Sequence, residues 1–174
     1  MNKRKESNLY ETRVVAFLDI LGFSELVQTG RQHDILDVMN DIETRFDTLE
    51  RMKNPVDLTA FSDSIFLSAA PLDDDFGIVR LVQYVLHMVS GYFWRGILVR
   101  GGITIGDVYH KHPVVFGPAL IAAYEIESQQ AVYPRIVVEE EVMHRFVTSN
   151  HMQTQKVSNP QSAFRKDGDG LIHL

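Results

Sequence analysis

The apolar residues of this chain are grouped into runs that alternate between strand and helix periodicity, and this order restricts the folds open to it. A β-branched and aromatic run at residues 13–20 predicts a buried strand. Residues 24–53 carry apolar side chains at spacings of three and four, which predicts helix with a break at Gly30. Two further runs, at 56–62 and 64–69, predict a pair of strands.

The second half of the chain supplies another helix and another strand. Residues 76–93 form an amphipathic pattern, and residues 97–105 form an apolar run that we expect to resume at 107–109 after a turn at Gly106. The order β-α-β-β-α-β predicts an α+β, ferredoxin-like fold. The additions that follow are a helix from 118 to about 128, a strand at 135–138, a helix at 139–147 and a turn at 166–170.

Composition limits the classes of partner. We predict one domain over residues 1–174, with a polar tail to about residue 11, because 45% hydrophobic content in 174 residues suits a single core. A net charge of −6, with one short basic run at residues 3–5, argues against nucleic acid as a partner. The absence of cysteine excludes disulfides and thiolate metal sites. We expect no membrane partner and a cytoplasmic location, since no long apolar segment or signal-peptide pattern is present.

Two aspartates lie at the edges of strand-forming runs. Asp19 follows an apolar run and precedes Gly22, and Asp63 lies between two apolar runs where a hairpin would turn. Carboxylates in such surroundings are costly to bury and suit divalent cations. Either aspartate alone is equally well explained as a helix cap or a turn residue. Together with the glycine-bearing turn, the pair makes a site for metal ions and a triphosphate plausible.

Four motifs in order resemble those of the class III nucleotide cyclases. They are residues 17–23 (FLDILGF), 61–64 (FSDS, with serine where glycine is usual), 100–108 (RGGITIGDV) and 116–120 (FGPAL). The resemblance covers roughly residues 12–140. It implies a single catalytic domain that joins the ribose 3′-hydroxyl of a nucleoside triphosphate to its α-phosphate, in a homodimer whose active sites lie between the subunits.

The resemblance also implies roles for individual residues. Asp19 and Asp63 would bind two divalent cations, Mn²⁺ or Mg²⁺, with the Ile20 carbonyl as a further ligand. The backbone of three residues would hold the triphosphate: Leu21, Gly22 and Phe23. For the transition-state cation we favour Arg100, which begins a strand beside two glycines, although a structural ion pair would explain it equally well.

Four residues that differ from the purine cyclases indicate which nucleotide base the chain would bind. Where purine cyclases have a transition-state asparagine and arginine, this chain has Ile121 and Glu125, and the base-reading lysine and aspartate are replaced by Thr59 and Val114. Thr59 can hydrogen-bond a pyrimidine edge, and two aromatic residues, Phe61 and Tyr124, can stack on a base. Phe61 is alternatively a core residue.

The loss of the purine contacts is similar to the pyrimidine cyclases of bacterial Pycsar antiphage defence. This resemblance implies a uridylate cyclase, with UTP favoured over CTP, whose cyclic UMP activates a separate effector protein. Two alternatives stay open. One is an adenylate or guanylate cyclase with substituted base contacts, and the other is an inactive nucleotide-binding or interaction module.

Overall fold

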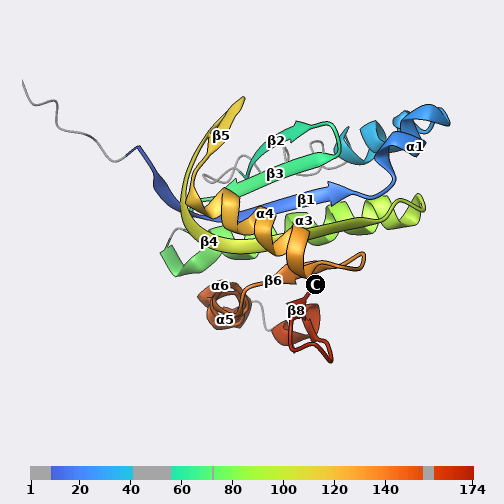
Figure 1. Ribbon diagram of the computed structural model, residues 1–174. Helices are drawn as coiled ribbons and strands as arrows, with labels where there is room; N and C mark the ends of the chain where they lie inside the picture. Colours follow the sequence, from blue (N-terminus) through green and yellow to red (C-terminus); the bar gives the residue numbers. More distant parts are fainter. Residues whose placement is uncertain (1–8, 41–55, 72, 155–158) are drawn as a thin grey trace, which may run out of the picture.

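The computed structural model describes residues 9–40, 56–71, 73–154 and 159–174. It contains the predicted β-α-β-β-α-β order (Figure 1). The predicted helix over 24–53 is interrupted at Gly30, which has a φ of 79°, and its part beyond residue 40 lies outside the described residues. The elements of this unit are β1 (Glu11–Ile20), α1 (Phe23–Gln28), the helical residues 32–40, β2 (Asp57–Phe61), β3 (Ser64–Ala69), α3 (Phe76–Trp94) and β4 (Val99–Lys111).

The strands form one sheet in which β1 is central. Its first four strands lie in the order β2-β3-β1-β4 and are antiparallel throughout, which is the ferredoxin-like arrangement. The sheet continues beyond β4 through three short strands: β6 (Ile136–Val138), which is parallel to β4, β8 (Ile172–His173) and β7 (Arg165–Lys166). The strand β5 (Val114–Phe116) forms a hairpin with the end of β4.

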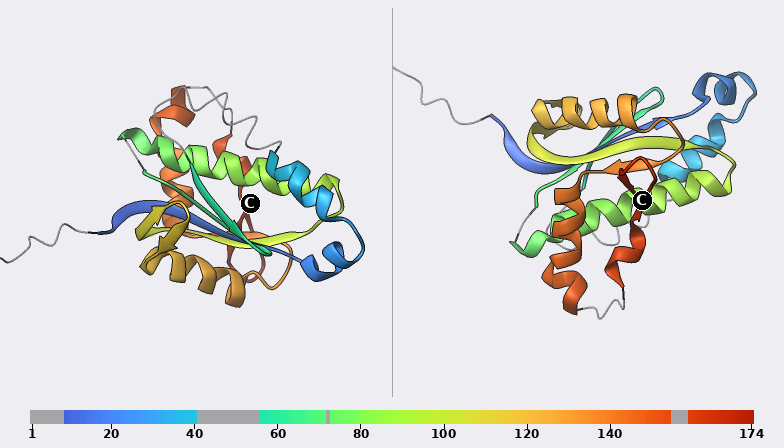
Figure 2. Two further views of the ribbon diagram at one scale, coloured as in Figure 1. Left: turned by 90° about the horizontal axis from the view of Figure 1, so that it is seen from above. Right: turned by 60° about the horizontal axis from the view of Figure 1, so that its bottom comes forward.

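Helices cover the two faces of the sheet (Figure 2). On one face α3 packs on β1, β3 and β4, and this layer contains the main hydrophobic core. On the other face α4 (Pro118–Gln130) packs on β1 and β4. Two helices near the C-terminus, α5 (Glu140–Thr148) and α6 (Asn150–Thr154), complete the α3 side. In the part of the chain that the structure describes, no helix has the length and apolar character needed to cross a membrane.

Two expectations about the later strands need correction or extension. The predicted turn at Gly106 is wrong, because Gly106 pairs with Arg13 and β4 runs without a break through the β1 ladder. The predicted turn over residues 166–170 lies within a hairpin of β7 and β8. Arg135 ties this hairpin to the body of the protein by ion pairs of 2.7 Å to Asp167 and to Asp169.

Two glycines of β4 set the position of α4. A Cβ atom at Gly102 would lie 2.5 Å from the Ala123 carbonyl oxygen and 2.7 Å from the Ile126 Cβ. At Gly106 it would lie 3.2 Å from the Ala119 Cβ. Glycine at these two positions therefore allows the helix to approach the strand closely, and this approach places the C-terminal half of α4 beside the start of β4.

We predict that Gly102→Ala lowers the free energy of unfolding by about 1–3 kcal/mol, the usual range for overpacking, because the added methyl group meets the Ala123 carbonyl oxygen and the Ile126 side chain of α4. Gly168→Ala is the matched control, since a Cβ there has open space around it. Urea unfolding followed by circular dichroism measures both. Equal stability of the two variants would contradict the tight packing of α4.

Candidate active site

The structure brings the two aspartates together at one end of the central strands. Asp19 is the penultimate residue of β1, and Asp63 lies in the two-residue turn between β2 and β3. The Ile20 N–H donates a hydrogen bond of 2.9 Å to the Asp63 carbonyl, which fixes the turn against β1. Ser62, beside Asp63, has a φ of 58°, a left-handed conformation that favours glycine. The turn is thus kept despite the serine.

An ion-pair cluster adjoins Asp19. Arg100 is the cross-strand partner of Asp19, and its Nε donates a hydrogen bond of 3.3 Å to Asp19 Oδ2. The same nitrogen lies 2.5 Å from Oε1 of Glu127, on α4. Arg100 is therefore in an ion pair, as the structural alternative predicted, and its side chain is still 32% exposed. It lies beside the proposed metal ligand.

Glu127 is the residue that sequence reasoning missed. Its side chain is 3% exposed, and it lies on the buried stripe of α4 that includes Ala123. Burial raises the pKa of Glu127, the Arg100 guanidinium lowers it, and the Asp19 and Asp63 carboxylates raise it again. An acidic residue four positions after Ala123 on an apolar stripe was the available signal, because a buried carboxylate needs a cationic partner.

The turn after β1 offers fewer backbone donors than the resemblance implies. Gly22 has a φ of 71°, and a Cβ there would have no neighbour within 4 Å, so a ligand can approach its backbone. The Leu21 N–H is already used, because it donates a hydrogen bond of 2.9 Å to the Leu98 carbonyl. The donors left for a phosphate at this turn are the N–H groups of Gly22 and Phe23. The helix α1 that follows has only six residues.

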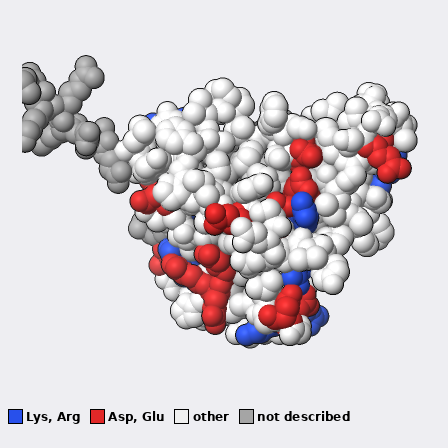
Figure 3. Space-filling view, viewed as in Figure 1, with Lys and Arg blue, Asp and Glu red and all other residues white. Residues whose placement is uncertain are grey.

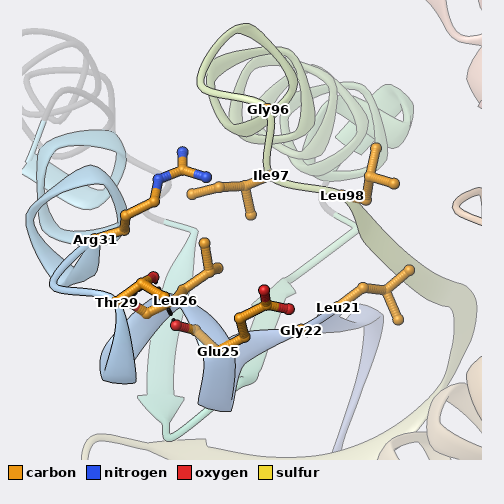
Figure 4. A pocket seen from close by; sticks show the side chains of 9 residues that line it. All are labelled: Leu21, Gly22, Glu25, Leu26, Thr29, Arg31, Gly96, Ile97 and Leu98. Carbon is orange, nitrogen blue, oxygen red and sulfur yellow. Dashed lines mark hydrogen bonds between the residues drawn. The ribbon is translucent and has the colours of Figure 1, made fainter.

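A pocket of about 560 Å³ lies beside this turn (Figure 4). Leu21 and Gly22 form part of its wall, and Glu25 and Arg31 contribute a carboxylate and a guanidinium. Arg31 is partly engaged, since it donates to the Arg95 carbonyl. Neither Asp19 nor Asp63 lines this pocket, so it borders the candidate site without containing the carboxylate pair.

The predicted base-contacting residues lie on the α4 side of the sheet and at its rim. Phe61, at the end of β2, is 79% exposed, so the alternative that it belongs to the core is wrong. Tyr124 is 52% exposed and makes an edge contact of 5.4 Å between ring centroids with Phe17. Both aromatic residues therefore have exposed surface that a ligand or a second subunit can contact.

Thr59 is part of a hydrogen-bonded group with His110 and Ser68. Its hydroxyl lies 3.0 Å from Nε2 of His110, and the Ser68 hydroxyl lies 2.8 Å from Nδ1 of the same ring. Burial lowers the pKa of His110, with an opposing effect of Asp57 and further lowering by Arg13. A neutral imidazole has one donor and one acceptor nitrogen, so its tautomer decides whether Thr59 donates to the ring or accepts from it.

The donor set suits a metal that is bound together with a substrate. Across residues 9–40, 56–71, 73–154 and 159–174 no group of three His, Cys, Asp or Glu side chains forms a complete metal cage. Asp19 and Asp63 supply carboxylate oxygens from backbone positions that the Ile20–Asp63 hydrogen bond holds together, and in the same ranges Asp63 has no ion-pair partner. One or two carboxylates plus substrate phosphates are the usual ligands of Mg²⁺ in nucleotide enzymes. The pair fits this kind of site.

The face of the molecule shown in Figure 3 is not strongly basic. On the face shown in Figure 3, acidic atoms form the larger coloured patches, and basic atoms lie in small groups beside them. This distribution agrees with the net charge of −6. It gives a nucleic acid backbone no continuous basic surface on this face.

Comparison with solved structures identifies the fold. At the sequence level, no protein-family model and no curated protein matches the chain. In structure it is similar to the adenylyl cyclase CyaB from P. aeruginosa, with a TM-score of 0.58 and 15% identity over 79% of this chain and 81% of that one. It is also similar to the guanylate cyclase domain of RhGC from Catenaria anguillulae in complex with GTP, with a TM-score of 0.55 and 18% identity over 94% of each chain. This protein therefore has the fold of the class III nucleotide cyclase catalytic domain.

Proposed function

We propose that this protein is a nucleotide cyclase that converts a pyrimidine nucleoside triphosphate, UTP in preference to CTP, into its 3′,5′-cyclic monophosphate and pyrophosphate. The observation that carries the proposal is the meeting of Asp19 and Asp63 at one end of the central strands of a cyclase fold. A buried or half-buried carboxylate pair without a function would be costly to keep.

Each residue of the site has a proposed role in the reaction. In the reaction the ribose 3′-oxygen attacks the α-phosphorus, the bond from that phosphorus to the bridging oxygen breaks, and the hydroxyl proton leaves to water. Two divalent cations, Mn²⁺ or Mg²⁺, would lower the pKa of the 3′-hydroxyl and neutralise the leaving pyrophosphate. Asp19 and Asp63, with the Ile20 carbonyl, would hold these cations. The N–H groups of Gly22 and Phe23 would bind phosphate oxygens.

Arg100 has a suitable position for a phosphate contact. Within the described ranges its two terminal nitrogens have no hydrogen-bond partner, since its contacts with Asp19 and Glu127 use Nε. A guanidinium presents planar donors that match phosphate oxygens. The proposed role of Arg100 is therefore to stabilise charge on the phosphates, in place of the arginine that Glu125 replaces.

Support for a pyrimidine comes from the residues near the base. Thr59 and Val114 offer neither the cation nor the carboxylate with which purine cyclases read adenine. Thr59 is held by His110 and keeps one free hydrogen-bonding direction. Uracil presents a donor at N3 and cytosine an acceptor, so the tautomer of His110 would select between them through Thr59. Phe61 and Tyr124 would stack on the ring.

A homodimer would complete each active site. Exposed apolar side chains lie on the α4 face and at the β2–β3 turn, among them Phe61, Ile121 and Tyr124. Such residues are typical of protein interfaces.

In light scattering at assay concentration we expect twice the chain mass of 19.9 kDa. Ile121→Asp should give the monomer and abolish turnover, whereas the exposed Val132→Asp should do neither. An active monomer would contradict the shared site.

The proposed role in the cell follows from the Pycsar resemblance. The cyclic pyrimidine nucleotide would be a second messenger in antiphage defence, and it would activate a separate effector protein.

Turnover of UTP, CTP, ATP and GTP with Mn²⁺ or Mg²⁺ tests the activity. We expect cyclic UMP as the main product in chromatography. Asp19→Asn and Asp63→Asn should each lower the rate at least about 100-fold, or about 2.7 kcal/mol, because each removes a charged metal ligand. Asp37→Asn, on the helical segment 32–40, is the control and should have the native rate.

The other outcomes decide between the alternatives. A cyclic purine as the main product would support the adenylate or guanylate cyclase and contradict the pyrimidine assignment. Absence of any cyclic product, with nucleotide binding retained, would support the inactive module.

Thr59→Val tests the reading of the base. It keeps the shape of the side chain and removes the hydroxyl, so the preference for UTP over CTP should fall about threefold to tenfold, the equivalent of one hydrogen bond of about 0.5–1.5 kcal/mol. Thr12→Val, whose hydroxyl bonds the exposed Asp107, is the matched control. The ratio of kcat/KM for the two substrates is the measurement. An unchanged ratio would remove Thr59 from base selection.

A further inference from the structure

Arg100 contacts two carboxylates, and its contacts with them differ in distance and in hydrogen bonding. Its Nε–H donates to Asp19 Oδ2 at 3.3 Å, although the nearer oxygen is Oε1 of Glu127, at 2.5 Å. The contact with Glu127 is an ion pair that lacks hydrogen-bond alignment, so this buried oxygen has no hydrogen-bond partner. The guanidinium is thus hydrogen-bonded to the more exposed carboxylate and lies closest to the buried one.

Glu127 cannot move far from this position. It lies one residue after Ile126, which packs on Gly102, so the close approach of α4 to β4 fixes its backbone. Its side chain is 3% exposed, whereas that of Asp19 is 19% exposed. A charge so buried needs its partner, while the partly exposed Asp19 can exchange one cation for another.

We propose that Arg100 is the resident counter-ion of Asp19, that a divalent cation displaces it, and that Glu127 is the positioning residue that retains the displaced guanidinium. This inference rests on the proposed function, in which Asp19 is a metal ligand. When the cation takes Asp19, the Nε–H of Arg100 turns to the unsatisfied Glu127 oxygen. Because Arg100 and the metal compete for Asp19, Glu127 strengthens metal binding by holding the competitor aside.

Two simpler explanations for Glu127 make different predictions. If Glu127 acted only through its negative charge, removing both charges of the Arg100–Glu127 pair would leave metal affinity unchanged, because the net charge stays the same. If Glu127 were itself a metal ligand, removing both would weaken binding. Competition by Arg100 predicts the opposite sign, since the competitor is lost together with the residue that restrains it.

The test is Mn²⁺ binding to the full chain without nucleotide, followed by the electron paramagnetic resonance signal of free Mn²⁺. We expect Glu127→Gln to weaken binding about fivefold. We expect the double variant Arg100→Gln/Glu127→Gln to bind about fivefold more tightly than the native chain. Glu125→Gln, an exposed neighbour on the same helix, is the matched control and should change affinity by less than about twofold.

The Mn²⁺ affinity of the double variant decides between these explanations. Arg100→Gln alone is less suitable, because it leaves Glu127 buried without a partner and can unfold the chain. Thermal unfolding by circular dichroism verifies that each variant is folded. Native or weaker Mn²⁺ affinity of the folded double variant would overturn the inference. Asp19→Asn separates this result from failure of the proposed function. If Asp19→Asn binds Mn²⁺ as the native chain does, the metal site assigned to Asp19 is wrong and both proposals fall.

Discussion

The pairing of β1 on both of its edges is the constraint on which the rest of the structure depends. In that ladder Asp19 lies opposite Ser64 on one side and opposite Arg100 on the other. The same ladder fixes the turn that contains Asp63, through the hydrogen bond from Ile20. Two carboxylates and a guanidinium from three separate strands or turns thus meet without any long loop. Their mutual positions are properties of backbone hydrogen bonding, which is why a chain of this size can build the site.

A second constraint acts from the opposite layer. The glycines of β4 allow α4 to lie close to the sheet, and this closeness places a carboxylate of the helix next to Arg100. Arg100 therefore contacts Glu127 across the two layers and Asp19 across two neighbouring strands. The buried charge of Glu127 is costly without a partner, while the Asp19 carboxylate is partly exposed. Because Glu127 is more buried than Asp19, it depends more strongly on its ion pair with Arg100 than Asp19 does.

Local patterns in the sequence predicted the fold well because strand and helix periodicities were clear and the order of the elements was distinctive. They also placed the two aspartates at strand ends. The patterns failed at Gly106, where a glycine inside a strand was interpreted as a turn but serves the packing of α4. They did not identify Glu127, because burial of a helical position depends on what lies under the helix. They did not show that the Leu21 N–H is already bonded, because its acceptor is 77 residues away in the sequence.

The register of β1 between its two neighbouring strands has a consequence for how the protein can change over evolution. Insertions are tolerated where a loop can absorb them, as in the connection 167–171 between β7 and β8. One added residue in β1 would move every later side chain of that strand to the opposite face and separate Asp19 from both of its cross-strand neighbours at once. Length variation among relatives of this chain should therefore concentrate in the β7–β8 hairpin, while the spacing along β1 stays constant.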